Sequence, residues 1–250
     1  MNNPLPAVKL VEIFSSIQGE GLFVGCRQVF VRLAGCNISC QYCDTRESFV
    51  APASARIETT AACRIFENVT NPVPIADLVS AIERLYRSPH HSVSLTGGEP
   101  LLQPEAISAI AALRQSGTKI YLETNGTLPE ALAQVIRDVD IVSMDFKLPS
   151  AMYGNSYWRE HAAFLQIARQ REVFVKIVIS GETTQPELEQ AISLITDIDA
   201  TIPLILQPVT PLNGICAIDS GAVLRVQELA MQKLQTVRVI PQTHKMLGQL

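Results

Sequence analysis

Two periodicities alternate along most of the chain. Short runs of β-branched and aromatic residues are separated by longer segments with the spacing of amphipathic helices. Several of the short runs are apolar throughout, which is typical of strands covered on both faces. The predicted strands are Leu10–Phe14, Val29–Leu33, Val93–Thr96, Ile120–Thr124, Ile141–Asp145, Phe174–Ile179, Leu204–Gln207 and Val237–Ile240. The predicted helices lie near Ile75–Tyr86, Glu105–Gln115, Glu130–Arg137, Tyr157–Arg171, Pro186–Thr196 and Ser220–Leu234.

This order of elements predicts the fold class. Strands that alternate with helices favour a parallel sheet, either open or curved into a partial barrel. We expect an α/β fold in which residues 1–250 form a single domain, a partial (β/α)6-type barrel. Residues 46–74 mix Ala, Thr, Pro and Asn, and we interpret them as an irregular insertion with one short helix near Thr59–Glu67.

Polar or glycine-rich segments follow several of the predicted strands. In parallel α/β folds the chemistry gathers at the carboxyl ends of the strands, so we expect these segments to converge on one edge. They are the cysteine-containing loop after Leu33, Thr96–Pro100, Glu123–Gly126, Asp145–Lys147 and Gln207–Pro208.

Composition and charge exclude some classes of protein. A hydrophobic content of 47% supports a sizeable core, and a formal net charge of −4 gives no general attraction to a nucleic acid backbone. No apolar stretch approaches the roughly 18 residues of a membrane-spanning helix, and no signal peptide is visible. We therefore expect a cytoplasmic protein without nucleic acid or membrane partners, whose six cysteines are metal ligands, catalytic groups or packed thiols rather than disulfides.

Three cysteines share one loop with the spacing C-x3-C-x2-C: Cys36, Cys40 and Cys43. A structural zinc ion would need a fourth ligand, and no further Cys or His follows closely at a suitable spacing. On a four-iron cluster, three thiolates leave one iron open to an outside ligand. A zinc-stabilised binding module stays open as the non-enzymatic alternative.

With Tyr42 as the aromatic residue before the last cysteine, this loop resembles the signature of radical S-adenosylmethionine (SAM) enzymes. The resemblance implies a [4Fe-4S] cluster whose open iron chelates SAM, and a 5′-deoxyadenosyl radical made by reductive cleavage. Thr96-Gly97-Gly98-Glu99-Pro100 resembles the superfamily segment that binds the methionine amino group, although GGEP alone is also an ordinary strand-to-helix turn. The cofactor-binding residues implied in this way are Tyr42, Thr96, Gly97, Gly98, Glu99, Glu123, Asn125, Ser143, Lys147 and Gln207.

Four segments narrow the resemblance to the 7-carboxy-7-deazaguanine synthase family of queuosine precursor biosynthesis. They are Glu12–Gly21 (EIFSSIQGEG), Phe30–Asn37 (FVRLAGCN), Cys43–Thr45 (CDT) and Pro241–Lys245 (PQTHK). In that family 6-carboxy-5,6,7,8-tetrahydropterin becomes 7-carboxy-7-deazaguanine with loss of ammonia, after hydrogen abstraction from C6 of the pterin. SAM is regenerated and magnesium assists. The resemblance also implies a homodimer and an external electron donor such as flavodoxin or ferredoxin.

The residue types at the matched positions suit a pterin that carries a carboxylate and a guanidine-like edge. Arg32 has a planar fork of donors for the carboxylate, and Glu20 can accept hydrogen bonds from the amino-pyrimidine edge. Thr45 offers a hydroxyl oxygen to magnesium, and His244 offers a donor near the ring or the carboxylate. The implied substrate-binding residues are Ile17, Gln18, Gly19, Glu20, Arg32, Thr96 and His244.

Ordinary structural explanations compete with these roles. Arg32, on an apolar strand, could form an ion pair, and Gln18 and Glu20 could shape the turn around Gly19. Thr45 could cap a turn.

The reaction and the remaining motifs also have competing interpretations. A different radical SAM enzyme, such as a glycyl-radical activating enzyme, would share the cysteine and GGEP motifs. Asp145-Phe146-Lys147 stands where relatives often have serine-proline-lysine, so only Lys147 matches there. Cys26, Cys63 and Cys216 are expected to be packed thiols.

Overall fold

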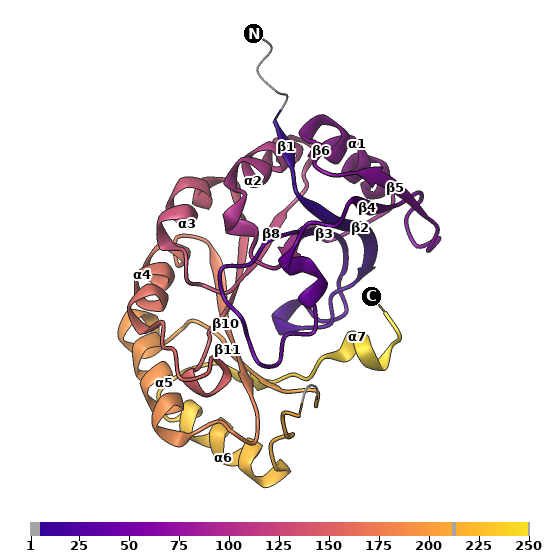
Figure 1. Cartoon of the computed structure of the whole chain (residues 1–250). Coiled ribbons are helices and arrows are strands. Elements are labelled where there is room, and N and C mark those ends of the chain that lie inside the picture. The colour runs from indigo at the N-terminus through magenta and orange to yellow at the C-terminus, as the bar shows by residue number, and fades with distance from the viewer. Residues whose placement is uncertain (1–5, 212–213, 250) are drawn as a thin grey trace.

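A ten-stranded sheet forms the centre of the protein (Figure 1). The computed structural model describes residues 6–211 and 214–249. The strands lie in the order β12-β11-β10-β9-β8-β7-β3-β2-β4-β5. Their bounds are β2 (Leu10–Ile17), β3 (Arg27–Leu33), β4 (Ser54–Glu58), β5 (Phe66–Thr70), β7 (Ser92–Gly97), β8 (Ile120–Thr124), β9 (Ile141–Asp145), β10 (Glu172–Ile179), β11 (Leu204–Pro208) and β12 (Val237–Val239). A separate two-stranded sheet pairs β1 (Ala7–Val8) with β6 (Val73–Pro74).

From β3 to β12 the neighbouring strands run parallel, and a helix connects each strand to the next. The connecting helices are α1 (Ile75–Tyr86), α2 (Pro104–Ala111), α3 (Pro129–Val135), α4 (Trp158–Ala168), α5 (Gln185–Asp199) and α6 (Ser220–Met231), and a short α7 (Thr243–Met246) follows the last strand. In Figure 1, α2 to α6 form an arc along the outside of the curved sheet. The predicted α/β partial barrel is confirmed. Within the described residues, no helix is long and apolar enough to cross a membrane.

Alternation along the parallel strands separates their two faces. In β10, Val175, Ile177 and Ile179 belong to the main core cluster, which also contains side chains from the outer helices. Lys176, between them, faces the other way and lines a cleft. The same alternation in the neighbouring strands brings polar side chains to this inner face, namely Arg32, Thr96, Glu123, Ser143, Asp145 and Gln207.

The N-terminal part of the sheet departs from the predicted parallel pattern. Strand β2 runs antiparallel to β3, and β4 and β5 form an antiparallel hairpin on the outer side of β2. The helix predicted near Thr59–Glu67 is wrong, because those residues form the hairpin turn and the start of β5. Burial alternates from residue to residue along β4, as it does in a half-buried strand. Ala55 and Ile57 point into the core, while Arg56 is exposed.

Candidate functional site

A cleft opens on the inner face of the barrel, at the carboxyl ends of the parallel strands. It is lined by every predicted site residue except Glu99. These residues are Ile17, Gln18, Gly19, Glu20, Arg32, Cys36, Cys40, Tyr42, Cys43, Thr45, Thr96, Gly97, Gly98, Glu123, Asn125, Ser143, Lys147, Gln207 and His244. The topology therefore brings together segments that lie more than 200 residues apart in the sequence.

The three motif cysteines share one wall of this cleft. They pack in a small apolar cluster with Ile38 and Met152. Burial raises the pKa of the thiols of Cys36 and Cys40, so these groups become thiolates readily only beside a cation that offsets the loss of water. All the cysteines of the chain lie among the described residues, and all are free thiols. Cys26 and Cys63 are partly buried, but Cys216 is exposed, so the prediction that it is a packed thiol is wrong.

The donor set fits an iron–sulfur cluster better than a single ion. Three thiolates on one loop leave a tetrahedral zinc ion one ligand short. On a four-iron cluster each thiolate binds a different iron, so Cys36, Cys40 and Cys43 need not converge on one point. The arrangement supports the cluster over the zinc alternative.

The paired glycines after β7 are required by the neighbouring backbone. A Cβ on Gly97 would lie 2.0 Å from the carbonyl oxygen of Leu33, and a Cβ on Gly98 would lie 2.1 Å from that of Gly35. Both distances are far below a van der Waals contact, so only glycine fits. Leu33 and Gly35 begin the cysteine loop, and the GGEP segment therefore packs directly against the backbone that carries the cluster ligands.

Glu99 is the one predicted cofactor-binding residue that does not line the cleft, and its carboxylate is fully buried. Oε1 accepts hydrogen bonds from Leu101 N at 3.0 Å and from Thr124 Oγ1 at 2.8 Å, and Oε2 accepts from Asn125 N at 2.8 Å. Burial raises its pKa to about 7, against these three donors. Glu99 thus ties the GGEP turn to the loop that follows β8.

Asn125 continues this connection to the cysteine loop. Its Nδ2 donates to Asn37 Oδ1 at 2.9 Å, and its Oδ1 accepts from the backbone N and the hydroxyl of Thr127. Asn37 Nδ2 donates in turn to Thr127 Oγ1 at 2.8 Å. Since Asn37 follows Cys36 directly, this set of amides fixes the start of the cluster loop.

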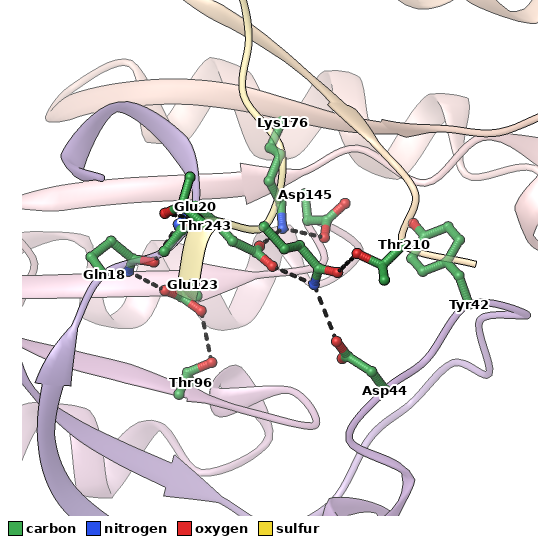
Figure 2. A network of polar contacts seen from close by, with 12 residues as sticks. Gln18, Glu20, Tyr42, Asp44, Thr96, Glu123, Asp145, Lys176, Thr210 and Thr243 are labelled. Atoms are coloured by element: carbon green, nitrogen blue, oxygen red, sulfur yellow. Dashed lines mark hydrogen bonds and ion pairs between the residues drawn. The ribbon is translucent and has the colours of Figure 1, made fainter. Parts of the chain in front are cut away.

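Gln18 is held by a polar network on the floor of the cleft (Figure 2). Its Nε2 donates to Glu123 Oε1 at 2.7 Å, as Figure 2 shows. Its Nε2 also donates to Gln28 Oε1 at 3.0 Å, and its Oε1 accepts from the backbone N of Glu20. Thr96 Oγ1 donates to the other oxygen of Glu123 at 2.8 Å. Gln18 therefore shapes the turn around Gly19, as its structural explanation predicts, while it also lines the cleft.

Four charged side chains pair in the wall of the cleft, next to Tyr42 of the cysteine loop. Lys176 Nζ forms ion pairs with Glu20 Oε2 and, at 3.2 Å, with Asp145 Oδ2 (Figure 2). Lys147 Nζ reaches the same oxygen of Asp145 at 2.9 Å and lies 3.2 Å from the hydroxyl of Tyr42. Burial raises the pKa of Asp145, but the two ammonium groups outweigh it and hold that pKa below its usual value.

Sequence reasoning missed Lys176 altogether. The signal was present, because Lys176 is the single charged residue in the otherwise apolar run Phe174–Ile179. Arg32 has the same setting in its own strand, although its predicted role came from its motif and its planar fork of donors. The departure at Asp145 was noticed, but its pairing with two lysines depends on strand register, in which Lys176 lies directly opposite Asp145.

Arg32 lines the cleft and also forms the ion pair that competes with its functional explanation. Its Nε donates to Glu12 Oε1 at 3.0 Å, and Glu12 Oε2 pairs with Arg56 at 2.6 Å. The guanidinium carbon lies 5.7 Å from the centre of the Phe14 ring. The ion pair uses Nε, and the two terminal nitrogens are the donors left for a ligand.

The C-terminal segment packs against the turn around Gly19. Thr243 donates to the Gly19 carbonyl from its backbone N at 2.9 Å and from its hydroxyl at 3.1 Å. A Cβ on Gly19 would lie 2.2 Å from His244 Nδ1, so the imidazole rests on bare backbone. In Figure 1 the yellow helix α7 accordingly lies beside the indigo N-terminal strands.

Gln242 connects both sides of the cleft. Its Nε2 donates to Glu20 Oε1 at 2.7 Å and to Asp44 Oδ2 at 3.1 Å, and its Oε1 accepts from Thr210 Oγ1 at 2.7 Å. Lys245 Nζ pairs with Asp44 at 2.9 Å. The segment Pro241–Lys245, which was predicted to be functional only from its motif, thus bridges the Glu20 turn and the cysteine loop.

The Thr45 hydroxyl stands beside the cysteine loop, 3.9 Å from Cys43 Sγ. It makes no capping hydrogen bond to the short helical turn that follows, although the Thr45 carbonyl accepts two hydrogen bonds from Ser48. The turn-cap explanation therefore does not account for the hydroxyl.

Two buried acceptors in the cleft wall have no protein donor among the described residues: Asp145 Oδ1 and Gln207 Oε1. A buried acceptor without a partner is costly, so a ligand that supplies hydroxyl or amino donors would stabilise this wall. A nucleoside carries both kinds of donor, and these residues therefore fit the adenosyl part of SAM.

Comparison with known proteins gives consistent matches. The family model described as "Radical SAM superfamily" matches residues 31–195. The chain is 44% identical to 7-carboxy-7-deazaguanine synthase of Geobacter sulfurreducens, covering 98% of this chain and 99% of that protein. It is 35% identical to the protein of the same name from Methanothermobacter thermautotrophicus, covering 96% of each. Among solved structures, QueE from Escherichia coli has a similar fold, with a TM-score of 0.63, 22% identity and 95% of each chain covered.

Proposed function

Since the chain belongs to the 7-carboxy-7-deazaguanine synthase family of radical SAM enzymes, we propose that the cleft described above is where the pterin ring is contracted. The enzyme acts in 7-deazapurine biosynthesis and converts 6-carboxy-5,6,7,8-tetrahydropterin to 7-carboxy-7-deazaguanine with loss of ammonia. This location for the reaction is supported above all by one observation: the three-cysteine loop, the Glu20 turn and Arg32 line the same cleft.

Cys36, Cys40 and Cys43 would hold the [4Fe-4S] cluster, and SAM bound beside it would supply the radical chemistry of hydrogen abstraction. The protein's part is to orient the two ligands and exclude water. Gly97 and Gly98 bring backbone groups close to the methionine portion, and the acceptors of Asp145 and Gln207 receive the donors of the nucleoside. The remaining residues proposed for the SAM site are Tyr42, Thr96, Glu123, Asn125, Ser143 and Lys147.

The substrate lies between the Glu20 turn and Arg32. Glu20 is ionised, because Lys176 lowers its pKa against the effect of burial, so it accepts hydrogen bonds from the amino-pyrimidine edge. The terminal nitrogens of Arg32 bind the substrate carboxylate. His244, on the bare backbone of Gly19, covers the ring from the C-terminal side, and Ile17, Gln18 and Thr96 complete the walls.

Three further parts of the proposal rest on family resemblance and donor chemistry. Thr45 would offer its uncapped hydroxyl to a magnesium ion. An external flavodoxin or ferredoxin delivers the electron, and two copies of the chain, each one domain, form a homodimer. A cytoplasmic location suits the free thiols, which need a reducing compartment.

Anaerobic turnover tests the proposal. Reconstituted, reduced protein with SAM, magnesium and 6-carboxy-5,6,7,8-tetrahydropterin should form the deazapurine and one ammonium ion per product. Cys40→Ala, which removes a cluster ligand, should abolish both, whereas Cys216→Ala, an exposed thiol outside the cleft, should not. Failure of the wild-type protein to form product where a relative succeeds would refute the function.

A further inference from the structure

Lys176 occupies a position that demands charged partners. It is 9% exposed on a strand whose neighbouring residues are buried and apolar. An ammonium ion removed from water costs several kcal/mol unless carboxylates surround it. Its two carboxylate partners come from different elements: Glu20 follows β2 in the chain, and Asp145 ends β9.

The pairing neutralises the wall as a whole. Lys176 and Lys147 balance Glu20 and Asp145, with Asp145 Oδ2 shared between both ammonium groups. Without Lys176, two buried carboxylates would face a single ammonium group, and their mutual repulsion would raise the pKa of Glu20. Lys176 is therefore the group on which the charge of Glu20 depends.

Lys176 also fixes the direction of the Glu20 carboxylate. One oxygen binds Lys176, as Figure 2 shows. The other oxygen accepts a hydrogen bond from Gln242 Nε2 at 2.7 Å. Each oxygen keeps a lone pair for a ligand, because a carboxylate accepts about four hydrogen bonds in all. A carboxylate held at both oxygens is pre-organised for a planar, donor-rich edge.

We propose that Lys176 is a positioning residue for substrate recognition, which holds the Glu20 carboxylate ionised and aimed at the amino-pyrimidine edge of the pterin. This assignment rests on the proposed function of the cleft. Lys176 acts through Glu20, so it sets the affinity for the pterin more than the affinity for SAM, because Lys147 remains paired with Asp145 when Lys176 is lost.

The test compares Lys176→Met with Lys176→Arg and with Lys233→Met, whose lysine bonds Ser193 on the outer helices. Lys176→Met should raise the KM for the pterin about tenfold or more, with a smaller change in kcat. Iron content after reconstitution should match wild type, which reports an intact fold and cluster, and the affinity for SAM should change less than the KM for the pterin because Lys147 still pairs with Asp145. Lys176→Arg should restore most of the affinity, and Lys233→Met should match wild type.

A double-mutant cycle shows whether the effect passes through Glu20. In a Glu20→Gln background, which has no carboxylate to hold, Lys176→Met should change KM less than twofold. An equally large KM increase in both backgrounds, or an unchanged KM in the single variant, would overturn the assignment. If Lys176→Met fails to assemble a cluster, Lys176→Gln provides the same comparison with a polar side chain of similar length.

The pH profile provides a second readout. Loss of the ammonium group raises the pKa of Glu20, so the acid limb of kcat/KM should move to higher pH in Lys176→Met and return in Lys176→Arg. The titratable and charged groups that surround Glu20 are Lys176 on β10, Asp145 and Lys147 at the end of β9, Tyr121 and Glu123 on β8, Asp44 in the cysteine loop, and His244 and Lys245 in the C-terminal segment. An acid limb that does not move would contradict the proposal. If the wild-type protein forms the deazapurine and the KM or pH test still fails, the role proposed for Lys176 is wrong and the proposed function stands.

Discussion

Glu99→Gln is the sharpest perturbation of the loops that frame the cleft. The carboxylate is 0% exposed and accepts three hydrogen bonds, two at Oε1 and one at Oε2. A glutamine amide has one acceptor oxygen only. If that oxygen replaces Oε1, the NH2 group faces the N–H of Asn125, and two buried donors then oppose each other.

The expected cost follows from these contacts. A buried donor left without its acceptor costs about 1–3 kcal/mol. Burial raises the pKa of Glu99 to about 7, so loss of the charge offsets part of this cost near neutral pH. For a chain of this size each kcal/mol shifts Tm by about 2–4 °C, so the lost hydrogen bond lowers Tm by roughly 2–12 °C before that offset.

The assay is thermal unfolding of the metal-free protein, alongside SAM binding to the reconstituted protein. Glu83→Gln, at an exposed position of α1, is the matched control and should leave both unchanged. Glu99→Gln should lower Tm and weaken SAM binding together, because the same carboxylate holds both loops. Weakened SAM binding with an unchanged Tm would mean that Glu99 contacts the cofactor directly and would refute this reasoning.

Three other predictions concern the cysteine loop, the core and Arg32. Gly98→Ala places a Cβ 2.1 Å from the Gly35 carbonyl and should lower the iron content after reconstitution, whereas Gly181→Ala, whose nearest contact is 3.3 Å, should bind iron normally. Burial lowers the pKa of His161 to about 3, so the folded protein holds this side chain neutral. The free energy of unfolding should therefore fall by about 1.4 kcal/mol per pH unit as the pH drops below 6.5. Denaturant titrations at pH 7 and pH 5.5 should show that the free energy of unfolding depends less on pH in His161→Gln than in wild type. Arg32→Ala should weaken pterin binding by about 1–3 kcal/mol, measured as an increase in KM, and should also destabilise the fold because Glu12 loses a partner; an unchanged KM would leave Arg32 only its structural ion pair.

The fold was largely predictable because the parallel strands and their helices carry strong local signals. Helix α1 was predicted with its observed bounds, and Pro104 and Pro129 begin α2 and α3 as their fixed φ suggests. The β4–β5 hairpin was missed, since its short strands mix polar and small residues and gain order by pairing with β2. Local propensity is a weak guide where tertiary pairing decides.

The candidate site was likewise predictable in one part and not in another. Convergence of the strand-end segments followed from topology, so Cys36, Gly98 and Gln207 were all expected at one edge. The inward turn of Glu99 and the pairing of Lys176 with Glu20 depend on the side-chain direction of each residue and on contacts between distant segments. A single sequence does not contain those contacts, although the lone lysine in an apolar strand marked the position.

The most direct test of the central claim follows the hydrogen at C6 of the pterin. Reduced, reconstituted protein is incubated with SAM and 6-carboxy-5,6,7,8-tetrahydropterin deuterated at C6, and the deazapurine and the recovered SAM are analysed by mass spectrometry. Deuterium should accumulate in the 5′ position of the recovered SAM as product forms, and Cys40→Ala should show neither. Product formed with no deuterium in SAM, or SAM cleaved without any deazapurine, would contradict the assignment of this cleft to radical ring contraction.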